Sequence, residues 1–112
     1  MFGDNGYNTY VRREWELFEG DGARARASLE AVDGGPMSRV LDVGCGAGQE
    51  LLPFVLERGA VGVGVDASPE AGRAGRALFS ARAPGARVAF VRAVAEALPF
   101  APGSFDVVVC RL

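Results

Sequence analysis

The stretch RVLDVGCGAGQE, residues Arg39–Glu50, joins a short apolar run, three alternating glycines and the start of a helical segment. A run such as VLDV is typical of a strand that is covered on both faces in a parallel sheet. The glycines allow a turn that side chains would block and let a ligand approach the main chain. A helix that starts directly after such a loop points free N–H groups at that ligand. The stretch therefore predicts a strand, a ligand-binding loop and a helix.

Four short apolar runs alternate with longer segments of helical character from position 39 onward. The expected strands are Arg39–Val43, Val61–Val65, Arg87–Arg92 and Phe105–Cys110. Strands that alternate with helices are typical of βαβ units and a parallel sheet. The sequence therefore predicts an α/β fold of three layers, with helices on both faces of a parallel sheet.

Two helices are expected between these strands. The segment Gln49–Arg58 carries an apolar stripe with the spacing that packs a helix against a sheet. The second helix follows Ser68, a residue type preferred as N-cap, with Pro69 in the first helical position and Glu70 in the first turn. We expect it to extend to about Ala83, where a Pro-Gly pair stops it.

The N-terminal part of the chain differs from the rest. Residues 1–38 hold two helical candidates, Thr9–Phe18 and Asp21–Val32, separated by a Gly-Asp-Gly break. We expect them to form an N-terminal helical cap region. It precedes residues 39–112, which contain the expected strands and the glycine loop.

The composition fits one ordinary globular domain, with 112 residues, a net charge of −2, 49% apolar and 23% charged residues. No apolar run approaches the roughly 20 residues that span a bilayer, and the N-terminus lacks a signal-peptide pattern. A cytoplasmic location with no membrane association is therefore expected. Scattered arginines in a mildly acidic chain form no basic stripe, which argues against nucleic acid as a partner.

Histidine does not occur in the chain, which excludes imidazole as a base or a metal ligand here. The two cysteines, Cys45 and Cys110, lack the CxxC spacing of zinc and thioredoxin-like sites, and we expect them to be reduced thiols. Without a histidine to activate it, Cys45 is a poor candidate for a catalytic nucleophile. No metal site is expected.

The spacing of the glycines separates two kinds of cofactor-binding loop. The dinucleotide fingerprint G-x-G-x-x-G would need a third glycine at position 49, which is Gln49 here. With Asp42 two residues before the first glycine, the pattern D-x-G-x-G-x-G resembles motif I of the class I S-adenosylmethionine-dependent methyltransferases. The resemblance implies a Rossmann-like sheet and a loop, Gly44–Gly48, that wraps the methionine part and the ribose of the cofactor.

Two further stretches resemble the same family. GVGVDASPE places Asp66 at the end of the second strand, where its carboxylate oxygens can accept both hydroxyls of a ribose. AEALPFAPGSFDVVVC resembles the family stretch D-A-E-x-L-P-F followed by S-F-D-V-V, which meets the adenine ring. The family's first acid is Val94 here. The resemblance therefore leaves Ala95, through its backbone N–H, and Glu96 as contacts to adenine.

The resemblance implies one set of cofactor-binding residues and assigns no catalytic residue. By analogy with the family, the backbone at Cys110 reaches the amine of the methionine part. The full expected set is Asp42, Gly44, Cys45, Gly46, Gly48, Asp66, Ala67, Ala95, Glu96 and Cys110.

The family's sheet normally has seven strands in the order 3-2-1-4-5-7-6, whereas the sequence ends directly after the fourth expected strand. The expected fold is therefore an incomplete Rossmann-like domain, and the chain is a truncated or fragmentary methyltransferase. The fourth strand would lie at an open edge with unpaired backbone groups. We expect self-association through that edge.

The expected function is methyl transfer from S-adenosylmethionine, as cofactor, to a small-molecule acceptor. Two alternatives stay open. One is a non-catalytic S-adenosylmethionine-binding remnant, or a module that a partner chain completes. The other is an NAD-dependent oxidoreductase, against which the loop spacing argues. An aminopropyl transferase would use a decarboxylated form of the same cofactor on this fold.

Overall fold

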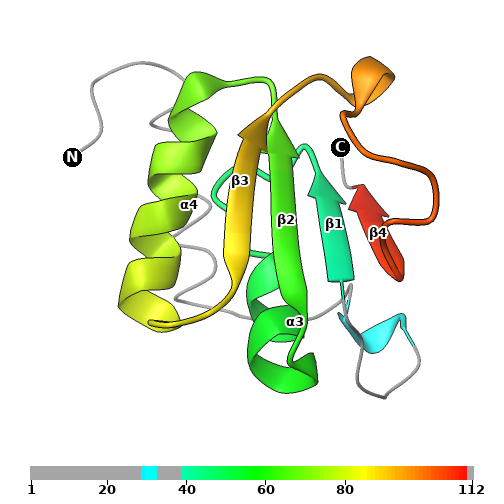
Figure 1. Cartoon of the computed structure of the whole chain (residues 1–112). Coiled ribbons are helices and arrows are strands. Elements are labelled where there is room, and N and C mark those ends of the chain that lie inside the picture. Colours follow the sequence, from blue (N-terminus) through cyan, green and yellow to red (C-terminus); the bar gives the residue numbers. More distant parts are fainter. Residues whose placement is uncertain (1–28, 33–38, 111–112) are drawn as a thin grey trace.

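Four parallel strands form one sheet in the described part of the chain (Figure 1). The structure, a computed structural model, describes residues 29–32 and 39–110. The strands are β1 (Arg39–Val43), β2 (Val61–Asp66), β3 (Val88–Arg92) and β4 (Val107–Cys110), and the elements between them are α3 (Leu51–Arg58), α4 (Pro69–Arg82) and the short 3-10 helix η1 (Ala95–Ala97). The expected strands and the two expected helices between them are confirmed, with bounds that differ by one or two residues.

The order of the strands is β3-β2-β1-β4, so β1 lies inside the sheet between β2 and β4. This is the order of the first four strands that the family resemblance implies. In register, Asp42 of β1 lies beside Gly64 of β2 on one side and Val109 of β4 on the other. Gly64 in turn lies beside Phe90 of β3. These four positions form one row across the sheet.

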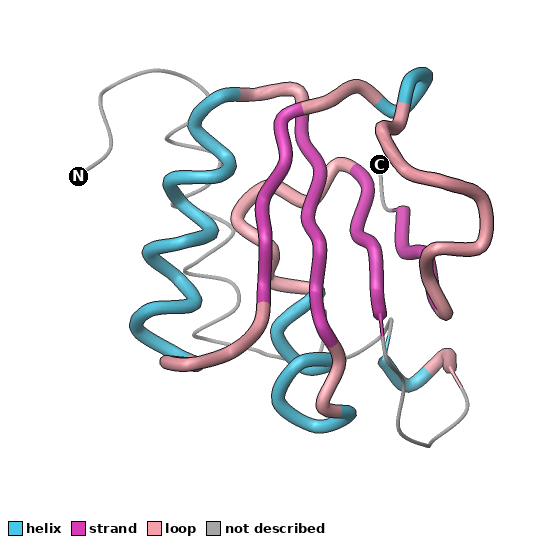
Figure 2. The backbone as a smooth tube through the Cα atoms, in the orientation of Figure 1, coloured by secondary structure: helices cyan, strands magenta, loops and turns pink. Residues whose placement is uncertain are grey.

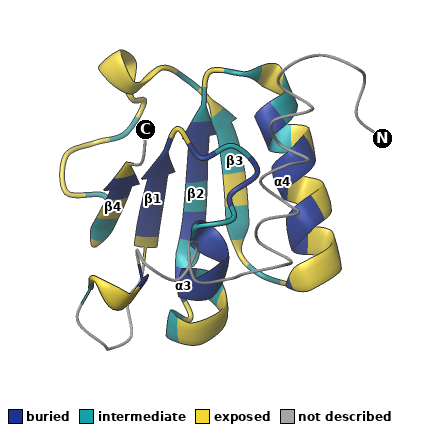
Figure 3. Cartoon of the chain, turned by 180° about the vertical axis from the view of Figure 1, so that it is seen from behind, coloured by how far each residue is buried: buried dark blue, intermediate teal, exposed yellow. Residues whose placement is uncertain are grey.

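Helices α3 and α4 lie on the same face of the sheet (Figures 1 and 3). The chain progresses from β1 to β3 in one direction, and right-handed crossovers then place both helices on one face. From β3 to β4 the direction reverses, so a right-handed connection must cross the opposite face. There Phe100 and Phe105 pack against a cluster that contains Leu41, Val43 and Val65.

The second face departs from the expectation of helices on both sides of the sheet. Within residues 39–110, the connection from β3 to β4 is irregular apart from η1. Pro99, Pro102 and Gly103 fall in that connection, and residues of these types interrupt helices. The described part of the chain therefore has one helical layer, and an irregular segment packs on the other face.

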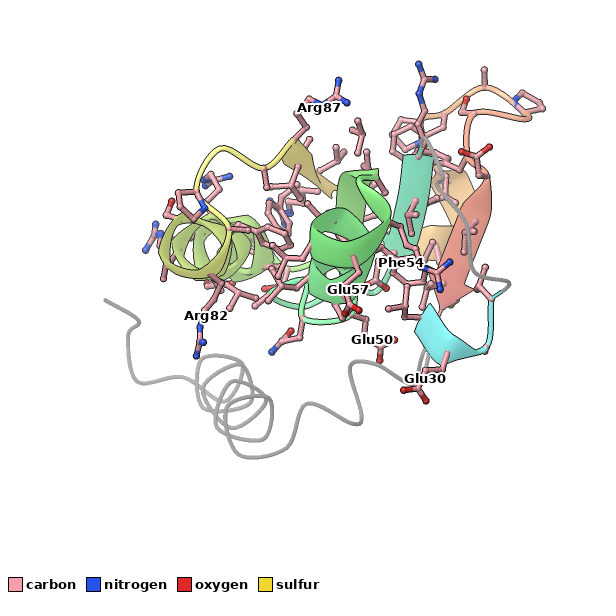
Figure 4. The ribbon with its side chains drawn as sticks, turned by 90° about the horizontal axis from the view of Figure 1, so that it is seen from below. Glu30, Glu50, Phe54, Glu57, Arg82 and Arg87 are labelled. Carbon is pink, nitrogen blue, oxygen red and sulfur yellow. The ribbon has the colours of Figure 1, made fainter. Side chains whose placement is uncertain are left out.

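The larger core cluster fills the space between the sheet and its helices. Val40 of β1, Leu51 and Phe54 of α3 and Leu78 of α4 are fully buried. Viewed from below, Phe54 points toward the sheet, whereas Glu50 and Glu57 lie on the side of α3 away from it (Figure 4). The apolar stripe expected for this helix is thus the face that packs.

A local capping signal defines the start of α4, whereas two hydrogen bonds between distant residues join the starts of β1 and β4. The Ser68 hydroxyl accepts a hydrogen bond from the N–H of Glu70, and Pro69 occupies the first helical position, as expected. At the amino ends of β1 and β4, the N–H of Arg39 donates to the carboxylate of Asp106 at 2.9 Å. The N–H of Asp106 donates to the carbonyl of Arg39, also at 2.9 Å. Asp106 thus joins the amino ends of β1 and β4.

The expected N-terminal helices, Thr9–Phe18 and Asp21–Val32, lie outside the described residues, apart from 29–32 at the end of the second. The division of the chain into a cap region, 1–38, and a cofactor-binding part, 39–112, therefore stays a prediction. Among the helices that the structure describes, none has the length and apolar character needed to cross a membrane.

Candidate functional site

The glycine loop connects β1 to α3 at the carboxyl edge of the sheet (Figure 2). Gly44, Gly46 and Gly48 have φ angles of +72°, +56° and +80°, values that favour glycine because it lacks a Cβ. The N–H groups of Gly44 and Cys45 both donate to the carbonyl of Val65, at 2.8 and 3.0 Å. The loop is therefore anchored to the end of β2.

The three glycines face different surroundings. A Cβ at position 44 would have no neighbour within 4 Å, and one at 46 would have only the side-chain oxygen of Gln49, at 4.0 Å. A Cβ at position 48 would instead lie 3.0 Å from the ring of Phe90 and 3.2 Å from that of Phe79. The loop thus has an open side at its first two glycines and a packed side at its third.

Asp66 joins the loop to the start of α4. One oxygen of its carboxylate accepts a hydrogen bond of 3.0 Å from the N–H of Gly46, and the other accepts one of 2.9 Å from the N–H of Ser68. A carboxylate oxygen has two lone pairs, so each oxygen retains the capacity to accept a further hydrogen bond. The acid therefore lies beside the open part of the loop and can still bind hydroxyl groups.

A hollow of about 180 Å³ lies beside Asp66, between the loop, the ends of β2 and β3, and α4. Its lining includes Cys45, Ser68, Phe90 and Arg92. Arg92 donates from Nε to the carbonyl of Ala67 at 3.0 Å. The residue that follows Asp66 is thus held against the end of β3.

Cys45 and Asp42 are buried beneath the loop, with 8% and 4% of their surfaces exposed. The Cys45 thiol donates to the carbonyl of Gly46 at 3.2 Å. Burial raises the pKa of this thiol well above its usual range, and the negative charges of Asp42 and Asp66 raise it further. The thiol is therefore protonated at neutral pH, which agrees with the expectation that Cys45 is not a nucleophile.

The remaining expected residues follow β3 and end β4. The N–H of Ala93 donates to the carbonyl of Asp66 at 3.2 Å, which brings the start of the next segment beside Asp66. Ala95 and Glu96 are exposed in η1. Cys110 is an exposed free cysteine in register with Val43 at the end of β1.

All expected site residues therefore lie at or just beyond the carboxyl ends of the four strands, except Asp42, which is buried in β1 below the loop. Ligands of open α/β sheets bind at this edge, next to the point where the strand order reverses. Hydrogen bonds join Gly44, Cys45, Gly46, Gly48 and Asp66 into one network that includes the carbonyl of Val65. The next residue, Ala67, accepts from Arg92. Ala95, Glu96 and Cys110 share the edge with this network.

Sequence reasoning did not include three residues that the structure places at the site. Phe90 and Arg92 line the hollow beside Asp66. Gln49 has a side-chain nitrogen that is buried without a hydrogen-bond partner. One feature of the sequence could have indicated the position of Phe90. The stretches VGVGV and EAGRAG contain closely spaced glycines, which leave room for a large side chain from a neighbouring element.

Comparison with known proteins agrees with this arrangement. A family model described as a methyltransferase domain matches residues 40–112, from β1 to the last residue of the chain. The chain belongs to the class I S-adenosylmethionine-dependent methyltransferase family. The four-stranded methyltransferase sheet described above is incomplete relative to those of its relatives.

Two curated relatives are uncharacterized methyltransferases. One, from Synechocystis sp., is 40% identical over 80 residues, which make up 71% of this methyltransferase chain and 34% of the relative. The other, YcgJ of Bacillus subtilis, is 40% identical over 76 residues, with coverage of 65% and 28%. The chain thus spans about a third of the length of these relatives.

Solved structures share the fold. The crystal structure of YcgJ superimposes with a TM-score of 0.70 at 29% identity, over 81% of this chain and 38% of that one. An S-adenosylmethionine-dependent methyltransferase of Geobacter sulfurreducens, solved with S-adenosylhomocysteine, has a TM-score of 0.64 at 25% identity, over 78% and 35%. Membership of this family implies S-adenosylmethionine as the cofactor.

Proposed function

We propose that this domain binds S-adenosylmethionine between the glycine loop and Asp66 and belongs to an enzyme that methylates a small molecule. The observation that carries the proposal is the 3.0 Å hydrogen bond between the N–H of Gly46 and the carboxylate of Asp66. It places the acid against the open side of a loop whose first two glycines have free space around them. A ligand that has both hydroxyl groups and a part that needs close backbone approach fits this pair.

The residues present suit the cofactor. Asp66 would accept hydrogen bonds from the ribose hydroxyls, and Gly44, Cys45 and Gly46 would present their backbone to the methionine part. Asp42 and Gly48, both buried, would support the loop from below. The bound cofactor supplies the reactive methyl group, so the chain's own contribution is to orient the ligand and exclude water.

The adenine end of the site differs from the family pattern. Val94 stands where the family has an acid. This apolar residue is 46% exposed and lies directly before η1. Leu98, on the other side of η1, is also an exposed apolar residue. We propose that apolar contact with these side chains and the backbone of Ala95 hold the base, with Glu96 directed to solvent and Ala67 beside the ribose.

A small-molecule acceptor follows from the family resemblance of the segment Ala95–Phe105 and from the mild negative charge of the chain, which disfavours nucleic acid. The backbone at Cys110, at the end of β4, would contact the amine of the methionine part. We assign no general base among the residues described, because the contribution of these residues to methyl transfer is mainly positioning.

A non-catalytic role is the second candidate. The chain covers about a third of its curated relatives, and β4 forms an edge of the described sheet. A cofactor-binding module that gains turnover only with a partner carrying further strands is consistent with both observations. An NAD-dependent oxidoreductase is disfavoured by Gln49, which occupies the position of the third glycine of the dinucleotide loop.

The test is calorimetric titration of the 112-residue chain with S-adenosylmethionine, and with NAD in parallel. We expect saturable binding of S-adenosylmethionine that weakens at least tenfold in Asp66→Ala. Asp106→Ala is the matched control, because Asp106 also accepts a hydrogen bond from a backbone N–H but lies at the amino ends of the strands, away from the proposed site. Binding of NAD alone, or unchanged affinity in Asp66→Ala, would contradict the proposal.

Turnover separates the two candidate functions. A chain that is an enzyme on its own would transfer a labelled methyl group from S-adenosylmethionine into the small-molecule fraction of a cell extract. A binding module would show cofactor affinity without such transfer and would gain it only when a longer methyltransferase chain is added.

A further inference from the structure

Phe90 lies in the middle of β3 with its ring on the face of the sheet that α3 and α4 cover. Three glycines from three different elements surround the ring. A Cβ at Gly64 of β2 would lie 3.0 Å from it, one at Gly48 of the loop also 3.0 Å, and one at Gly75 of α4 would overlap it. These three neighbours lack a side chain, and the ring occupies the space that their missing Cβ atoms leave open.

A second ring completes the contact. Phe79 of α4 meets Phe90 edge to face, with 5.8 Å between the ring centroids. Both rings lie against Gly48, since a Cβ there would be 3.2 Å from Phe79. The back of the glycine loop thus rests on an aromatic pair, and aromatic pairs of this geometry are stabilising contacts with a preferred orientation.

The ring also borders the buried part of the loop. The Cys45 Sγ atom would lie 2.7 Å from a Cβ at Gly64, so Cys45 and Phe90 share the gap above that glycine. Phe90 and Cys45 both line the hollow beside Asp66. Gly48 donates its N–H to the carbonyl of Cys45, which links the supported glycine to the rest of the turn.

We propose that Phe90 is a positioning residue. Its ring supports the glycine loop at Gly48 and thereby keeps Gly46 within hydrogen-bond distance of Asp66. The inference rests on the proposed function for its consequence in cofactor binding. Its structural part, that the ring supports the loop, stands on the contacts alone. No atom of Phe90 lies within 4 Å of a Cβ built at Gly44 or Gly46, so its close contact with the loop is at Gly48.

The first experiment tests the structural part without any cofactor. In a Cys110→Ser chain, Cys45 is the one remaining thiol, and its buried position makes it a reporter of loop displacement. We expect Phe90→Ala to raise the rate of Cys45 alkylation by iodoacetamide at least tenfold over Leu78→Ala. Leu78 is a fully buried residue of α4 in the same core cluster, so its truncation is the matched control for general loss of stability.

The second experiment measures the dissociation constant for S-adenosylmethionine in chains that retain Cys110. Phe90→Ala should raise it at least fivefold over Leu78→Ala at a temperature where both are folded, and Phe90→Leu should be intermediate. If Phe90→Ala does not fold, Phe90→Leu is compared with Leu78→Val in both measurements. Equal effects of the Phe90 and Leu78 variants on alkylation would overturn the inference.

The two experiments distinguish the failure of each proposal. If the unmodified chain does not bind the cofactor, the proposed function is contradicted. The alkylation rates would still decide whether Phe90 supports the loop. Binding that weakens in Phe90→Ala only as much as in Leu78→Ala would show that Phe90 acts as an ordinary core residue.

Discussion

The carboxylate of Asp66 accepts a hydrogen bond of 3.0 Å from the backbone N–H of Gly46, a residue 20 positions earlier in the chain. The bond joins the end of β2 to the loop that follows β1. The second oxygen of the same carboxylate accepts the N–H of Ser68, the N-cap of α4. One side chain thus connects the three parts of the structure that converge on the proposed cofactor site.

Replacement of Asp66 should therefore reduce stability as well as binding. Asp66→Ala removes the acceptors for Gly46 and Ser68, and we expect the free energy of unfolding to fall by about 1–3 kcal/mol. Asp66→Asn keeps one acceptor oxygen and should lose less. Urea denaturation measures the free energy of unfolding of both variants. Equal stability of Asp66→Ala and the unmodified chain would show that these two bonds contribute nothing net.

The loop glycines should differ in their tolerance of a side chain. Gly44→Ala imposes a left-handed residue in open space, at a cost of about 1–2 kcal/mol. Gly48→Ala adds contact with the rings of Phe79 and Phe90, and the extra overpacking should cost a further 1–3 kcal/mol, approximately. Thermal denaturation compares the two.

Gly103 provides the reference for these substitutions. It has a φ of +75° and no neighbour within 4 Å of a Cβ, far from the loop in sequence. Gly103→Ala should match Gly44→Ala in stability and leave cofactor binding unchanged. If Gly48→Ala is no less stable than Gly103→Ala, the claim that Gly48 packs closely against Phe79 and Phe90 is wrong.

The buried Cys45 thiol should make stability fall at alkaline pH. Because burial raises its pKa in the folded chain, the stability it contributes is complete below the ordinary thiol pKa, about 8.5, and is lost as the pH rises above that value. The loss should approach about 1.4 kcal/mol per pH unit. The measurement is the unfolding free energy between pH 7 and 10, with Cys45→Ala as the control that lacks this slope. Parallel pH profiles would argue against a buried, protonated thiol.

An acid at position 94 should strengthen cofactor binding. Val94→Asp restores the residue type that the family pattern has beside adenine, and the exposed position accommodates a carboxylate without burial. A charge-assisted hydrogen bond to the base should lower the dissociation constant about tenfold. Leu98→Asp, on the other side of η1, is the control and should weaken binding. The same change in both variants would indicate a general effect of negative charge.

The edge of the sheet at β4 should promote association of the isolated chain. Val108 is 58% exposed on this strand, and an uncovered apolar edge strand pairs readily with another chain. We expect the 112-residue chain to elute on size exclusion as species larger than a monomer, with Val108→Lys shifting it toward the monomer. Elution of the unmodified chain as a compact monomer across a hundredfold range of concentration would disprove this expectation.

Local sequence signals predicted much of the fold because they act between near neighbours. The Ser68–Glu70 segment begins α4 as expected, since its cap requires only residues two or three apart. The alternating glycines predicted a turn after β1 that side chains would block, and in the structure each of the three has a positive φ. The irregular second face of the sheet was not predicted, although the prolines and glycine in that connection are visible in the sequence.

The sequence by itself determined the strands, the two described helices, the loop and the acid at the end of β2, because each depends on residue types at short spacing. Only the tertiary structure decided that Asp66 bonds to Gly46, that Cys45 is buried beneath the loop, and that Phe90 fills the space left by three glycines. These contacts join residues far apart in the chain. They depend on the register of parallel strands and on the distance between a helix and a sheet, and no local spacing encodes either.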